Sequence, residues 1–340
     1  MQRVVSLGIF AFAIIAGVPS LAADDLAACA TGPVSSGIIA VCTRIIDAGK
    51  LDDRSRATAY SRRADARRAT GEIDPAIADY SEAIRLNPND ARVFHERGSA
   101  YFAKSELDRA IRDFDEAIRL NPNVSSFHGR GVAYANKGEY DKAIQDFDQA
   151  IILSPINAVV FSSRGLTYAR KRDFDRAITD YTNAISLDPK LAIAFHGRGA
   201  AYANEGQYDR AIDDFDQAIQ IDANYVQAIG ARGETYKAKG DYDRAIQDFT
   251  RLTRLNPNNA SAFNERGQAY AEKGDPDNAI LDFTVAIRLN PASAAALFNR
   301  GSAFLSKGEP DRAIGDLDQA IKVDPQLSDA FHKRGMAYFD

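Results

Sequence analysis

The side chains with the most distinctive chemistry in this chain of 340 residues are its four histidines. They are His95, His128, His196 and His332, and the intervals between them are 33, 68 and 136 residues. Imidazole titrates near neutral pH and is a common metal ligand, so a row of histidines could form a pH-responsive lining or bind a metal. Shared ancestry of repeated segments would give the same spacing without any function.

Two further sets of residues carry opposite charges at the same spacing. Each arginine directly precedes a small residue, and each aspartate directly precedes an aromatic residue or a leucine. A charged track for a ligand is one explanation, but such regularity within one chain fits a structural ion-pair ladder between helices better. The two sets are Arg63, Arg97, Arg130, Arg164, Arg198, Arg232, Arg266, Arg300 and Arg334, and Asp79, Asp113, Asp146, Asp180, Asp214, Asp248, Asp282 and Asp316.

The elements that position these residues follow a 34-residue period. Recurring prolines mark it at intervals of 34, 33, 34, 68, 34 and 34 residues, from Pro88 to Pro325. Within each period, small, aromatic and Ala-Ile positions are spaced three, four and seven residues apart, which predicts one buried face on each of two helices. A Lys-Gly turn such as Lys273-Gly274 separates the two helices, and Asp275-Pro276 supplies the N-cap and first residue of the second.

This pattern resembles the tetratricopeptide repeat over residues 57–340. The resemblance implies an all-α fold, a right-handed superhelical solenoid of stacked antiparallel helix pairs. Two departures, Arg67 at an aromatic position and Ser105 at a turn glycine, indicate local looseness near the start. We predict a terminal half repeat at 328–340 and eight repeats at 57–90, 91–123, 124–157, 158–191, 192–225, 226–259, 260–293 and 294–327.

The N-terminal sequence is typical of a targeting segment. Arg3 precedes 15 uncharged residues and a small-residue stretch, so we predict a signal peptide at 1–22, cleaved after residue 22 or 23, and a periplasmic or secreted protein. Export permits a disulfide between Cys29 and Cys42, which would staple a degenerate helical hairpin cap at 23–56. Two free buried thiols are the alternative. Cys29 also lies in a lipoprotein-like context, but two aspartates separate it from the apolar run, so we expect membrane attachment only if Cys29 is lipidated.

The resemblance also implies a concave surface lined by the first helix of each repeat. Its centre is apolar and small, which suits an extended peptide or an amphipathic helix. Alternatively, these small residues only allow the superhelix to close tightly. The expected spacing of adjacent first helices suits a row of separate histidine contacts better than a single metal site shared by several histidines. The predicted peptide-binding groove comprises His95, Phe102, His128, Val132, Ala135, Ser162, Leu166, Ala169, His196, Ala200 and Ala203.

The C-terminal half repeat is unusually apolar, with Met336, Tyr338 and Phe339 near its end. Self-association or docking of a partner through this end is therefore a further hypothesis.

Composition and motifs exclude several function classes. The net charge is -5 and there is no basic run, which argues against nucleic-acid binding. We find no phosphate loop, nucleophile elbow or zinc motif, so we predict no enzyme activity, no catalytic residues, no metal and no other cofactor. The predicted function is a non-catalytic protein–protein interaction scaffold with a protein or peptide partner. An accessory subunit that recruits or regulates an envelope enzyme is the alternative.

Overall fold

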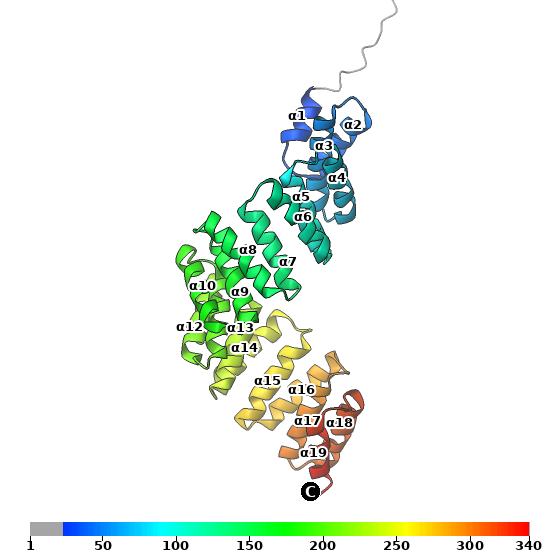
Figure 1. The fold of residues 1–340 in the computed structure, drawn as a ribbon. Coiled ribbons are helices and arrows are strands. Elements are labelled where there is room, and N and C mark those ends of the chain that lie inside the picture. Colours follow the sequence, from blue (N-terminus) through cyan, green and yellow to red (C-terminus); the bar gives the residue numbers. More distant parts are fainter. Residues whose placement is uncertain (1–22, 340) are drawn as a thin grey trace, which may run out of the picture. The chain divides into compact units, whose positions relative to one another are not determined.

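The structure is a computed structural model that describes residues 23–339, and within that range every regular element is a helix. The predicted signal peptide at 1–22 lies outside the described residues. The chain forms two compact units that divide after Leu153, the N-terminal unit (described from residue 23 to 153) and the C-terminal unit (154–339). In each unit, helices that are consecutive in the chain pack together (Figure 1).

Each repeat contributes two helices, and short helices flank the repeats at both ends. The cap consists of α1 (Ala23–Thr31) and α2 (Ser36–Asp47), and the last helix is α19 (Ser328–Ala337). The first helices of the repeats are α3 (Asp53–Ala69), α5 (Ala91–Ala103), α7 (Val124–Asn136), α9 (Ala158–Arg170), α11 (Ala192–Asn204), α13 (Val226–Ala238), α15 (Ala260–Lys273) and α17 (Ala294–Ser306). The second helices are α4 (Ile73–Leu86), α6 (Leu107–Leu120), α8 (Tyr140–Leu153), α10 (Phe174–Leu187), α12 (Tyr208–Ile221), α14 (Tyr242–Leu255), α16 (Pro276–Leu289) and α18 (Pro310–Val323).

The turn between the two helices of a repeat has a left-handed backbone. Gly206, for example, has φ +75°, a conformation that costs a residue with a side chain roughly 1 kcal/mol or more. Two repeats adopt this conformation without glycine, at Ser105 (φ +61°) and Arg172 (φ +62°). The first of these was anticipated from the sequence, and the second was not.

The two helices of a repeat approach closely where the sequence has its glycine column. A Cβ atom added to Gly199 on α11 would lie 2.8 Å from Cε1 of Phe215 on α12, so a side chain there would collide with the ring. Phe215 is almost fully buried, and the alanines one turn to each side of it are completely buried. Close packing of an aromatic ring, or of Leu317 in the last repeat, against this small-residue column therefore holds each helix pair together.

Arginine and aspartate join the same two helices at the edge of this core. In each repeat the guanidinium group donates two parallel hydrogen bonds to a carboxylate 16 residues later; for Arg198 and Asp214 both are 2.8 Å long. Arg67, which replaces the aromatic residue of the first repeat, donates a third bond to Asp79. The paired residues are Arg63–Asp79, Arg97–Asp113, Arg130–Asp146, Arg164–Asp180, Arg198–Asp214, Arg232–Asp248, Arg266–Asp282 and Arg300–Asp316.

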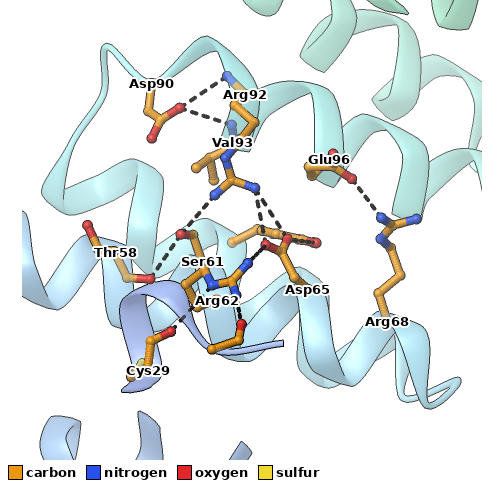
Figure 2. Close-up of polar contacts among 12 residues, drawn as sticks. Cys29, Thr58, Ser61, Arg62, Asp65, Arg68, Asp90, Arg92, Val93 and Glu96 are labelled. Carbon is orange, nitrogen blue, oxygen red and sulfur yellow. Dashed lines mark hydrogen bonds and ion pairs between the residues drawn. The ribbon is translucent and has the colours of Figure 1, made fainter. Parts of the chain in front are cut away.

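A disulfide joins the two helices of the cap, and polar contacts attach the cap to the first repeat. A disulfide joins Cys29 on α1 to Cys42 on α2, and both residues are buried. Arg62 on α3 donates hydrogen bonds to the carbonyl oxygens of Cys29 and Gly32, where α1 ends (Figure 2). These carbonyls have no partner within a helix that stops there, so Arg62 satisfies the end of α1 and fixes it to α3.

Candidate functional site

The histidines of the predicted lining pack against the second helix of their own repeat. The rings of His95, His128 and His196 lie 5.4, 5.7 and 5.9 Å from those of Phe114, Phe147 and Phe215. Burial lowers the pKa of all three imidazoles, so they are neutral at neutral pH. Among residues 23–339, no group of three His, Cys, Asp or Glu side chains could hold a metal ion.

The predicted groove residues are divided between the two units. His95, Phe102, His128, Val132 and Ala135 belong to the N-terminal unit, where Ala135 is buried and so contributes to packing. The C-terminal unit holds Ser162, Leu166, Ala169, His196, Ala200 and Ala203. Five of these six line one cavity, and Ala203 packs instead beside the core around Phe215.

This cavity, which we call the α9–α11 cavity, has a volume of about 520 Å³ and a mainly apolar lining. Its size is within the range of about 300–1,000 Å³ that is typical of ligand pockets. Its lining includes Leu166 and Ile193, which are exposed, and Tyr225, which directly precedes α13. Ile193, Tyr225 and Tyr181, which also line the cavity, were not predicted, because they lie outside the three sequence columns that define the predicted lining.

Small residues create the space. A Cβ atom at Gly197 on α11 would lie only 2.4 Å from Cζ of Tyr181 on α10, so the glycine lets the tyrosine ring reach the cavity. Ala200 replaces the larger residues that other repeats carry at the same position, such as Leu166 and Glu234, whereas alanine at the position of Ala169 recurs in other repeats. The cavity therefore depends in part on Ala200, a substitution particular to its repeat.

Arg172 supplies a cation at the edge of the α9–α11 cavity. It occupies the position at which other repeats have a turn glycine, and it keeps the left-handed backbone there. Its guanidinium group lies 5.9 Å from the ring centre of Phe174 and forms no ion pair within the described residues. Arg170 also lines the cavity, whereas no carboxylate does. The rim is therefore suited to an anionic group next to an apolar one.

Further along the C-terminal unit, a charged cluster joins α13 to α15. Lys237 donates hydrogen bonds of 2.6 Å to Glu265 and 3.1 Å to Gln268, and lies 3.0 Å from Glu234. Burial and the neighbouring Glu265 carboxyl raise the pKa of Glu234 to about 7. Two carboxylates thus share one ammonium group, and one of them changes charge near neutral pH.

A related cluster joins α3 to α5 in the N-terminal unit (Figure 2). Arg68 donates a 2.8 Å hydrogen bond to Glu96, at the positions that Lys237 and Glu265 occupy in their repeats. Asp65 accepts hydrogen bonds from Tyr80 and Arg92, and Arg92 also donates to Ser61. Every charge in this cluster has a partner, so the cluster stabilises the stack and offers no free charge to a ligand.

The end of α19 exposes large apolar side chains. Tyr338 occupies the aromatic column and is 67% exposed, whereas the corresponding Tyr202 is 5% exposed. Phe339 is 94% exposed, and Met336 is also exposed. Within the described residues, no second helix covers them as α12 covers Tyr202.

Models of the tetratricopeptide repeat match residues 95–158, 160–191, 192–225, 231–292 and 283–328, and a TPR repeat model matches residues 64–105. The chain belongs to the tetratricopeptide repeat family. The family fold is a non-enzymatic repeat scaffold for protein–protein interaction, so this tetratricopeptide repeat protein carries such a scaffold. No curated protein matches the chain. No helix within residues 23–339 has the length and apolar character needed to span a membrane.

Solved structures agree with this fold. A tetratricopeptide repeat protein from Parabacteroides merdae is 20% identical, with 73% of this chain and 98% of that one covered and a TM-score of 0.55. The C-terminal part of a TPR repeat-containing protein from Cytophaga hutchinsonii is 18% identical, with 70% and 98% covered and a TM-score of 0.58. At these identities the likeness shows the all-α repeat fold alone.

Proposed function

We propose that this tetratricopeptide repeat protein is an exported scaffold of the cell envelope that binds a segment of another protein in the α9–α11 cavity. The observation that carries the proposal is an open, apolar cavity with exposed Leu166 and Ile193 in its walls and polar groups at its edge. Exposed apolar side chains in a concave site favour a ligand that buries an apolar side chain of its own.

Export is supported by the composition of residues 1–22 and by the disulfide, which persists in oxidising compartments. A sulfur atom in a disulfide cannot carry a lipid, so the Cys29–Cys42 bond favours a chain without a lipid anchor. The mass of the mature chain tests both points. Cleavage after residue 22 or 23 is expected, and an acylated chain that begins at Cys29 would contradict the proposal.

Site-specific photo-crosslinking tests the cavity itself. A crosslinking residue at Ile193, in the cavity wall, should capture a partner in the native envelope fraction. The same residue at Leu281, which is more exposed than Ile193 and lies on α16 outside the cavity lining, should not. Leu166→Glu should remove the captured band while the far-ultraviolet spectrum stays that of a folded helical protein. Equal capture at both positions would contradict a partner site in the cavity.

The alternative, an accessory subunit of an envelope enzyme, predicts a different partner. In that case the captured protein is an enzyme, and its rate changes on mixing with the wild-type chain but not with Leu166→Glu. A captured partner without such an effect favours the plain scaffold.

A further inference from the structure

The α9–α11 cavity and the end of α19 have complementary chemistry. The cavity offers apolar walls and, at its rim, the guanidinium group of Arg172 without an ion-pair partner in the described structure. The chain after α19 offers two exposed aromatic residues, Tyr338 and Phe339, followed in the sequence by Asp340. An aromatic side chain next to a carboxylate is the ligand that these walls and this cation would accommodate.

We infer that the Tyr338–Phe339–Asp340 segment of one molecule binds in the α9–α11 cavity of a second copy of this chain. Phe339 would lie between Leu166 and Ile193, and the side-chain carboxylate of Asp340 would pair with Arg172. This inference uses the cavity of the proposed function but identifies a particular occupant, a second copy, in place of an unrelated protein.

The segment cannot reach the cavity of its own molecule. Within the C-terminal unit, four steps between first helices separate α11 from α19, which amounts to about 30 Å or more at the usual spacing of packed helices. Tyr338 and Phe339 extend α19 by only about 7 Å when fully stretched. The contact therefore forms between molecules.

Arg172 gives a second reason to expect a ligand at this rim. An arginine in the left-handed conformation is less favourable than the glycine that most repeats use at this turn. Its side chain forms no ion pair within the described residues that would offset this cost. A carboxylate from another molecule would provide the missing partner.

The surfaces are different on the two molecules, so the contact is heterologous, and every linear assembly keeps a free cavity at one end and a free C-terminal segment at the other. Residues 23–340 should consequently show an average mass that rises continuously with protein concentration in sedimentation equilibrium. A mass fixed at that of one chain across the whole range would overturn the inference.

Arg172→Gly is the decisive variant. It installs the residue used at the same turn by Gly206 and Gly240, so it should fold at least as well as wild type. It should nevertheless weaken self-association about tenfold or more, which corresponds to at least about 1.4 kcal/mol. Self-association that is as strong in Arg172→Gly as in wild type would overturn the role of the arginine and with it the inference.

Two matched experiments complete the test. Tyr338→Ala with Phe339→Ala should abolish association, whereas Leu281→Ala, which removes an exposed leucine on α16, should leave it unchanged. A mixture of Arg172→Asp and Asp340→Arg chains should associate, although neither does so alone. Aspartate is tolerated in the left-handed region, so the exchange keeps the turn. Failure of the mixture to associate would contradict the pairing.

A labelled peptide of residues 328–340 separates this inference from the proposed function. The peptide should bind to the Tyr338→Ala, Phe339→Ala chain, and adding Leu166→Glu to that chain should prevent the binding. If the peptide fails to bind while crosslinking at Ile193 still captures a partner, the second-copy inference is wrong and the scaffold function stands.

Discussion

Arg198 holds Asp214 through two parallel hydrogen bonds, each 2.8 Å long, across the interface between α11 and α12. The aspartate side chain is 7% exposed and the arginine side chain 18% exposed, so both charges are largely withdrawn from water. Such a pair contributes little compared with apolar residues of the same shape, but removing one partner leaves a buried charge without compensation. Removing one partner of a pair therefore destabilises the fold by more than the intact pair stabilises it.

Arg198→Ala should lower the free energy of unfolding by roughly 3 kcal/mol, because it leaves Asp214 buried and unpaired. Replacing both residues, as in Arg198→Met with Asp214→Leu, should cost less than Arg198→Met alone. Thermal and urea unfolding followed by circular dichroism would measure this. Arg85→Ala, which breaks an exposed pair with Glu82, is the control and should change stability by about 0.5 kcal/mol or less. An unfolding curve for Arg198→Ala that coincides with wild type would contradict a structural role for the ladder.

Ser105→Gly should stabilise the protein by about 1 kcal/mol, because Ser105 has φ +61° and glycine adopts that conformation without a steric cost. Ala103→Gly, two residues earlier, is the matched control. Ala103 is the last residue of α5, so glycine should be neutral to destabilising there. Urea titration of the two variants should move the midpoint upward for Ser105→Gly only. The same shift for both would mean that the turn stores no strain.

The repeat architecture could be predicted because it recurs. Gly199 and Phe215 each stand in a column of equivalent residues, so the two-helix repeat and its period follow from spacing alone. The cavity could not be predicted in the same way, because it depends on residues that differ between repeats. Arg172 breaks the turn-glycine column, and Tyr225 stands where most repeats have a small polar N-cap residue such as Asn259. A search for residues that depart from their column, in place of those that conform, would have found both.

The charge of the α13–α15 cluster should change within the neutral pH range. Because the pKa of Glu234 is raised from 4.5 to about 7, its carboxyl is mainly protonated at pH 6 and mainly ionised at pH 8. A raised pKa in the folded state means that the proton is held more tightly than in the unfolded chain. Taken alone, Glu234 therefore stabilises the fold most below its unfolded pKa, and this contribution is lost as the pH rises through about 7.

Carbon-13 NMR titration of the glutamate carboxyls would measure this pKa. Glu265→Gln removes the neighbouring negative charge and should return the pKa of Glu234 toward its ordinary value. Lys237→Met removes the compensating cation and should raise the pKa further. A Glu234 that titrates near 4.5 in wild type, or shifts in the same direction in both variants, would contradict the shared-ammonium arrangement.

Arg62 should control how firmly the cap is held on the first repeat. Its guanidinium group is the donor to two carbonyl oxygens at the end of α1, and the cap core of Ile38, Ile45 and Ala59 is small. Arg62→Ala would leave those carbonyls without their donor, which costs about 1–3 kcal/mol where they stay out of water. Hydrogen exchange should consequently become faster in residues 23–47, because local opening is governed by such local contacts.

Arg85→Ala is the control for this variant, since Arg85 lies on α4 and pairs with the exposed Glu82. It should leave exchange in the cap unchanged, and neither variant should alter exchange in α11 or α12. Reduction of the Cys29–Cys42 disulfide should add to the effect of Arg62→Ala, because the covalent link holds α1 to α2 and the arginine holds α1 to α3. If hydrogen exchange in the cap is equally slow in Arg62→Ala and in wild type, the disulfide and the apolar contacts hold the cap without a contribution from Arg62.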